Sequence, residues 1–160
     1  MQEAKNEDLY LSFDQLQERL TAVQSDYENG KLTLQDYVLF LTTFFSSDRK
    51  SETYAIKWKN VNFTTSQITI GKALDKFGNE KSTKGNKTTI FHIPNELKQF
   101  LQQWKVQQKE ELAQFEIEQT EEQLLFTFFD DKGNINQRLH TDYLNYCMKS
   151  IERRYKHLTL

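Results

Sequence analysis

The feature that most constrains the fold is a stretch in the middle of the chain, residues 82–96, where a basic turn leads into a strand and the strand into a helix. The turn reads Lys-Gly-Asn-Lys at 84–87, and the β-branched and aromatic residues of 88–93 favour a strand. Pro94, the one proline of the chain, disfavours a longer strand and suits the start of a helix. This order predicts a domain in which a sheet packs against helices.

Apolar residues at helical spacing predict the helices around that stretch. The second helix is apolar on most sides, so we expect it to lie at the centre of the core. A short helix should follow it, and the helix after Pro94 should bury one stripe that includes Leu97, Leu101 and Trp104. The predicted helices cover residues 11–26, 33–45, 51–58, 94–115 and 141–155.

Three short strands are predicted at 61–63, 67–70 and 88–93, forming a small antiparallel sheet from which the Lys-rich hairpin at 84–87 projects. Residues 75–79 read as a loop, and 124–129 as an extended segment. The predicted fold class is therefore α+β, mostly helical, with a three-stranded antiparallel sheet. We expect residues 1–9 to be a polar tail or linker and 10–160 to be a single domain.

Composition excludes several classes of protein. With one cysteine, Cys147, the chain has no internal disulfide and no cysteine-based zinc site, and its three histidines lack metal-ligand spacing. The longest strongly apolar run, 37–45, is too short to span a bilayer, and the polar, acidic N-terminus does not resemble a signal peptide. We therefore expect a cytoplasmic protein with no membrane partner and no metal.

Charge is unevenly distributed along the chain. The net charge is −2, which disfavours a nucleic-acid partner, but residues 49–87 carry nine basic and three acidic side chains. The final segment, 149–160, carries four basic and one acidic side chain. A local basic stretch can attract a polyanion that the whole chain would not. The simpler interpretation is a solvated surface balanced by acidic neighbours.

Two groups of residues could carry chemistry. Arg49 lies between two predicted helices, where its guanidinium suits a phosphate and Glu52 could orient it; alternatively, the two form a local surface pair. Lys84 and Lys87 flank Gly-Asn and could reach a polyanion, or they could keep a hairpin tip soluble. The run 153–157 is interpreted as a basic helix end, because consecutive helical residues point in different directions.

The order of these elements resembles the catalytic domain of tyrosine recombinases, in particular phage and conjugative-transposon integrases. In that family an apolar helix ends in Thr-Gly-x-Arg-x-x-Glu, followed by a short Leu-Ala-Leu-x-Trp helix and a sheet that carries Lys-Gly-x-Lys. The matching segments here are 46–52, which includes Arg49 and Glu52, 54–58 (Tyr-Ala-Ile-Lys-Trp) and 84–87. The resemblance extends from about Tyr10 to the end of the chain.

The resemblance implies DNA cleavage by a tyrosine through a 3′-phosphotyrosyl intermediate, without a metal or other cofactor. Arg49 would clamp the scissile phosphate, Lys84 would be the general acid, and Glu52 would support the site. It implies double-stranded DNA at attachment sites and other integrase protomers as partners. The predicted DNA-contacting residues are Arg49, Lys50, Lys81, Lys84 and Lys87.

The chain also departs from the family pattern. Ser47 replaces the usual glycine, Asp48 adjoins Arg49, and Thr88 stands at the position of the family's strand arginine. The family's His-x-x-Arg motif, its second His or Trp and its nucleophilic Tyr are absent. We therefore expect part of a recombinase catalytic domain, inactive alone. The alternatives are a non-catalytic DNA-binding or regulatory module on the same scaffold and a helical protein–protein module.

Overall fold

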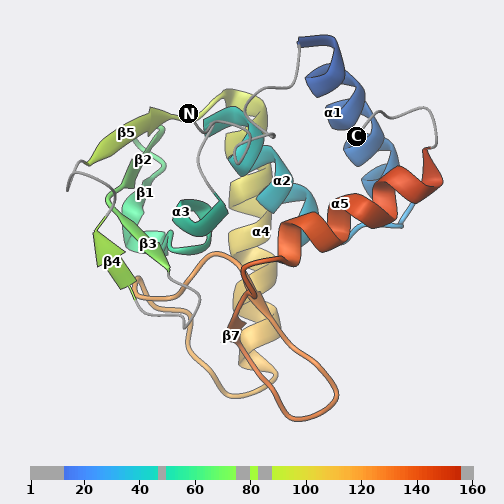
Figure 1. Ribbon diagram of the computed structural model, residues 1–160. Helices are drawn as coiled ribbons and strands as arrows, with labels where there is room; N and C mark the ends of the chain where they lie inside the picture. The colour runs from blue at the N-terminus through green and yellow to red at the C-terminus, as the bar shows by residue number, and fades with distance from the viewer. Residues whose placement is uncertain (1–12, 47–49, 75–79, 83–87, 156–160) are drawn as a thin grey trace.

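The computed structural model describes residues 13–46, 50–74, 80–82 and 88–155 (Figure 1). In these residues a group of helices comes first, five short strands follow, and two long helices then flank a short pair of strands. The helices are α1 (Phe13–Glu28), α2 (Leu34–Ser46), α3 (Lys50–Tyr54), η2 (Trp58–Asn60), α4 (Asn95–Ala113) and α5 (Tyr143–Arg154). The strands are β1 (Val61–Asn62), β2 (Gln67–Ile70), β3 (Lys72–Leu74), β4 (Glu80–Ser82), β5 (Thr89–His92), β6 (Thr127–Phe128) and β7 (Gln137–Arg138).

Helix α2 is the centre of the core, as its apolar sequence predicted. Six consecutive residues from Tyr37 to Thr42 are buried, and α1, α3 and α4 pack around the helix. Thr42 is tolerated inside because its hydroxyl donates to the Val38 carbonyl at 2.7 Å. The helix begins as expected, since the amide of Asp36 donates to the Thr33 hydroxyl at 3.1 Å.

The predicted three-stranded antiparallel sheet is confirmed, with the order β1-β2-β5. Ile68 and Ile70 of β2 point inward, whereas Thr69 between them is exposed. The turn from β1 to β2 includes Ser66 in the left-handed region, with φ 57°. The α+β class is therefore correct.

Several predicted boundaries were wrong. The short helix expected over 51–58 ends at Tyr54, and Trp58 instead begins η2, where its indole donates to buried Gln108 at 2.7 Å. The 124–129 segment forms a strand only at β6, which pairs with an unpredicted strand, β7. Gln35 of α2 binds the backbone of β6 through two hydrogen bonds. Its side-chain NH2 group donates to the Thr127 carbonyl at 2.7 Å, and its side-chain carbonyl accepts from the Thr127 amide at 3.1 Å.

An unpredicted hairpin lies just before the Lys-rich segment in the chain. A second hairpin, β3–β4, follows β2 after one residue, with Lys72 opposite Ser82 and Leu74 opposite Glu80. The predicted Lys-rich hairpin at 84–87 falls in the connection from β4 to β5, and it lies outside the described residues. Residues 75–79 and 83–87 themselves lie outside the described residues, as do 1–12, 47–49 and 156–160.

Two ion pairs join α1 to α5. Arg19 of α1 contacts Glu152 at 3.4 Å, and Arg154 of α5 donates through Nε to Asp26 at 2.8 Å. The Asp26 side chain is 2% exposed. Arg154 is therefore more than a basic helix end, because it neutralises a buried carboxylate.

Replacing Arg154 by Met should lower the free energy of unfolding by about 1–3 kcal/mol, because a buried acceptor loses its charged donor. Arg153→Met is the matched control: Arg153 is exposed and bonds only locally to Ser150, so its loss should cost about 0.5 kcal/mol or less. Urea unfolding at neutral pH measures both. Equal stability of the two variants would contradict the role given to Arg154.

A second polar contact fixes α5 against α2. The Tyr143 hydroxyl donates to Asp36 at 2.6 Å, and the Cys147 thiol lies 3.9 Å from the other carboxylate oxygen. Burial raises the pKa of Asp36, and the hydrogen bond from Tyr143 opposes this shift. Burial also raises the pKa of Cys147 to about 11, so this thiol is a poor nucleophile.

The raised pKa of Asp36 predicts a pH dependence. The folded state binds this proton more tightly than the unfolded state, so stability from Asp36 decreases as pH rises from 3.8 through the raised pKa. The free energy of unfolding of the wild-type chain should therefore fall relative to that of Asp36→Asn across this window. Tyr143→Phe removes an interaction that lowers the pKa and should extend the window upward. Urea unfolding at a series of pH values measures this comparison. A difference in unfolding free energy between the wild-type chain and Asp36→Asn that stays constant with pH would contradict the raised pKa of Asp36.

Candidate functional site

The candidate site is a cleft of about 280 Å³ between α3, the segment after it and the middle of the sheet. Glu52, Ala55 and Ile56 form one wall. The other residues that line the cleft are Asn60, Thr69, Ile70, Gly71, Lys72 and Thr88. Ala55 and Ile56 are buried, whereas Glu52 is partly exposed and Lys72 is exposed, so the charged groups lie toward the opening.

The cleft lies where strand pairing is interrupted. Ile70 pairs with Thr89, but Lys72, two residues later, pairs with Ser82. Between these two pairs, the part of the chain that runs from β4 to β5 contains five more residues than an unbroken strand ladder would contain. The five extra residues correspond to the connection 83–87. The interruption falls at Gly71 and Thr88, both of which line the cleft.

Gly71 permits this close approach. A Cβ atom at this position would lie 3.2 Å from the Thr88 hydroxyl oxygen, which is tighter than ordinary van der Waals contact. Glycine therefore lets the start of β5 approach the link between β2 and β3. No separate sequence signal predicted this contact.

The predicted site residues border this cleft to different extents. Glu52 lines it directly. Lys50 lies on α3, two residues before Glu52, and Lys81 lies on β4 opposite Ala73. Arg49, Lys84 and Lys87 lie outside the described residues. Their neighbours in sequence are described by the structure. Arg49 is the residue before α3. The segment 83–87 connects Ser82, which pairs with the cleft residue Lys72, to Thr88, which lines the cleft.

An ion-pair network, missed by sequence reasoning, joins β4 to the body of the molecule. Lys57 Nζ lies 2.8 Å from Glu80 of β4 and 3.2 Å from Glu122, and Lys59 Nζ lies 2.8 Å from Glu122. The hydrogen bond to Glu80, more than that to Glu122, raises the pKa of Lys57, so this lysine stays charged. These contacts link residues 65 and 23 positions apart, and no local pattern could reveal them.

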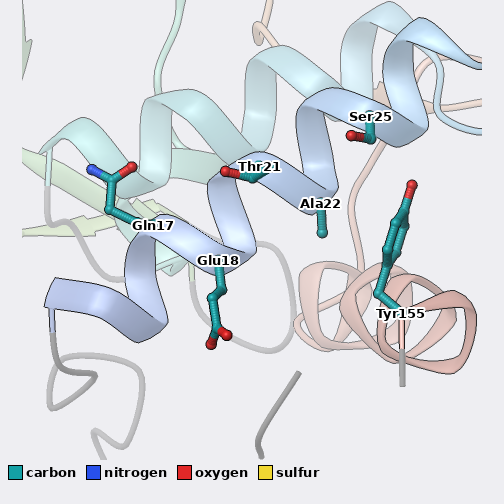
Figure 2. Close-up of a pocket in the computed structure, with 6 residues that line it drawn as sticks. All are labelled: Gln17, Glu18, Thr21, Ala22, Ser25 and Tyr155. Carbon is teal, nitrogen blue, oxygen red and sulfur yellow. The ribbon is translucent and has the colours of Figure 1, made fainter. Parts of the chain in front are cut away.

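A second cavity, also of about 280 Å³, lies between α1 and the end of α5. Figure 2 shows Gln17, Glu18, Thr21, Ala22 and Ser25 along α1, with the Tyr155 ring beside the last two. Its lining contains no pair of acidic groups and no basic side chain, so it offers no catalytic arrangement. In the described part of the chain, no three His, Cys, Asp or Glu side chains gather to hold a metal ion.

Within the same described residues, no helix combines the length and apolar character needed to cross a bilayer.

Comparison with solved structures defines the fold. The XerA recombinase is similar over 91% of this chain, with a TM-score of 0.57 and 18% identity. The integrase of the Tn1549 transposon, solved in complex with a circular intermediate DNA, is similar over 93% of this chain, with a TM-score of 0.64 and 16% identity. No protein-family model and no curated protein sequence matches the chain.

These similarities show that the chain has the tyrosine-recombinase fold, as the motifs predicted. It spans less than half of either chain, 42% of the recombinase and 45% of the integrase. The two structures therefore establish the scaffold, and the reaction and the partners are taken up as proposals below.

The network around Lys57 predicts how firmly β3–β4 is held. Lys57→Met should speed amide hydrogen exchange in Lys72–Leu74 and Glu80–Ser82, while global stability falls by about 1 kcal/mol or less because the pairs are partly exposed. Lys59→Met, which removes only a contact to Glu122, is the control and should leave this exchange nearly unchanged. Equal exchange in both variants would show that the Lys57–Glu80 pair does not hold the hairpin.

Proposed function

We propose that this chain is part of a site-specific DNA recombinase of the integrase type and that its cleft holds the scissile phosphate. One observation carries the proposal. The helix that follows Arg49 and the segments that flank 83–87 meet at the same cleft, within a tyrosine-recombinase fold. Residues separated by more than thirty positions in sequence, Glu52 and Thr88, line it together.

In this proposal the residues have distinct roles. Arg49 binds the non-bridging oxygens of the phosphate with its guanidinium, and Glu52 supports it from α3. Lys50, Lys81 and Lys87 contact the neighbouring backbone of double-stranded DNA. The Tn1549 integrase is solved with DNA, which supports DNA as the partner of this chain.

The proposed reaction requires a tyrosine supplied by a later part of the catalytic domain. Its oxygen attacks phosphorus, the bond to the 5′ oxygen breaks, and a 3′-phosphotyrosine forms. Lys84 donates a proton to the leaving 5′ oxygen, while Arg49 stabilises the charge on the phosphorane. Integration and excision of a mobile element would join such ends pairwise, with other protomers bound to the same DNA.

Binding of duplex DNA tests the partner. We expect the chain to bind a labelled duplex at low salt, with an affinity that falls linearly with salt on logarithmic axes. The double variant Lys84→Ala/Lys87→Ala should reduce the slope by about 1.8, the value for two phosphate contacts. Lys109→Ala/Lys132→Ala, which removes the same charge from exposed sites on α4 and after β6, should leave the slope nearly unchanged. Fluorescence anisotropy distinguishes these outcomes.

Formation of a covalent adduct tests the chemistry. A protein that extends this chain through the rest of its catalytic domain should trap a tyrosine–DNA adduct on nicked attachment-site DNA, and Arg49→Ala or Lys84→Ala should reduce its rate by about 10²-fold or more. DNA binding without any adduct would favour the non-catalytic alternative. Absence of both would reject a DNA function for this scaffold.

A further inference from the structure

Three aromatic rings from three helices pack together where α1 ends and where α2 and α4 begin. The Tyr27 ring of α1 stacks on the Tyr37 ring of α2, with centroids 4.4 Å apart and an angle of 6° between the planes. Phe100 of α4 meets both rings edge-on, with its centroid 6.0 Å from that of Tyr27 and 5.0 Å from that of Tyr37. These contacts hold the two tyrosine rings in fixed orientations.

The hydroxyl of Tyr37 is a polar group with unused hydrogen-bonding capacity. The side chain is almost fully buried, since Tyr37 is only 5% exposed. Within the described chain the hydroxyl has no hydrogen-bond partner, yet its oxygen is not sealed inside the core and stays open to solvent. A buried tyrosine hydroxyl usually finds a partner. This one is therefore positioned to bind a group that comes from outside the chain.

Two carboxylates from different helices lie around this hydroxyl. Burial raises the pKa of Tyr37, and the nearby acidic groups of Glu28, Tyr27 and Glu96 raise it further. Glu28 and Glu96 are both exposed, and neither forms an ion pair in the part of the chain that the structure describes. Glu28 accepts a neutral hydrogen bond from Gln24 at 3.2 Å. Both carboxylates therefore keep their negative charge beside the hydroxyl.

Glu28 occupies a position that favours a cation. It is the last residue of α1, and the last turn of this helix contains no basic residue. The carbonyl end of a helix carries partial negative charge, to which the carboxylate of Glu28 adds. Lys31, exposed in the connection to α2, forms no ion pair with Glu28 or Glu96 among the described residues. The negative charge at this end of α1 thus remains available to an external cation.

The chemistry of this surface matches a guanidinium group. Tyr27, Glu28, Tyr37 and Glu96, named here the Tyr37 patch, offer two carboxylates, one hydroxyl and a partly exposed ring. A guanidinium carries five N–H donors in one plane and stacks on aromatic faces. An ammonium is a compact point charge with no planar face. The patch therefore favours arginine over lysine.

We propose that the Tyr37 patch binds an exposed arginine of a partner protein, with the two carboxylates and the Tyr37 hydroxyl accepting its N–H groups and the Tyr27 ring stacking on it. The patch is negative, so the segment that carries the arginine is basic, and an anionic nucleic acid is repelled. This contact is independent of the proposed DNA function, because the patch shares no residue with the cleft.

A peptide titration of the 160-residue chain, followed by NMR, tests the patch. The probe is an acetylated and amidated glycine peptide with two arginines, and it should shift the backbone amides of Glu28 and Glu96. Glu28→Gln/Glu96→Gln should weaken binding about fivefold, because each exposed ion pair contributes modestly. The matched control is Glu110→Gln/Glu118→Gln, which removes the same charge from exposed positions on and after α4 and should change the affinity by less than about twofold.

Tyr37→Phe tests the hydroxyl alone, because it keeps the ring that stacks on Tyr27. It should weaken binding about threefold through the loss of one hydrogen bond. Thermal unfolding should be unchanged, since the hydroxyl bonds to no group in the described chain. A peptide with two lysines in place of the arginines should bind the wild-type chain several-fold more weakly.

Three results would overturn the proposal. Equal weakening in the two double variants would show that net charge alone attracts the peptide. Equal affinity for the arginine and lysine peptides, or an unchanged affinity in Tyr37→Phe, would reject a guanidinium site. Self-association of the chain that disappears in Glu28→Gln/Glu96→Gln would assign the patch to a second copy instead of a separate partner.

Discussion

The structure depends on the burial of α2 from all sides. Leu39 and Phe40 are 0% and 1% exposed, so the helix has no free face, and each neighbour must supply an apolar side. The neighbours come from distant parts of the chain: α1 before it, α3 and α4 after it. Asp36, at the start of the same helix, adds the polar contact that fixes α5. One buried helix thus positions both the α3 wall of the cleft and α5.

The cleft arises from a second constraint, the mismatch in strand register. β2 and β3 do not pair with β5 and β4 as one continuous ladder, because the connection 83–87 separates β4 from β5 in the chain. The ladder breaks instead, and Gly71 permits Thr88 to approach it. Tight pairing on both sides of the break, Ile70 with Thr89 and Lys72 with Ser82, fixes the two ends of that connection.

Local sequence was sufficient for most of the fold. Apolar spacing located the four long helices within a few residues, because each buries a single stripe or, in α2, the whole surface. β-branched residues located β2 and β5. The failures share a cause. β3, β4 and β7 are only two or three residues long, and pairing rather than propensity creates them. Glu80 and Ser82 are poor strand formers that pair because β3 lies beside them. Residues 75–79, predicted as a loop, lie between the two strands of this hairpin in the chain.

The site was predictable only in part, for the same reason. Glu52 was identified by its spacing from Arg49, and it lines the cleft. The partners of the charged residues were not identifiable, since ion pairs depend on the three-dimensional fold. The basic stretch predicted over 49–87 includes Lys57 and Lys59. In the fold, Glu122 neutralises both lysines, and Glu80 also pairs with Lys57.

Folding therefore redistributes the basic character of the chain. Arg154 is likewise neutralised by Asp26, so the final basic segment contributes Lys149 and Arg153 rather than the whole Arg-Arg pair. A polyanion is attracted by charge that remains unpaired at the surface, and net charge over a sequence window does not measure that quantity.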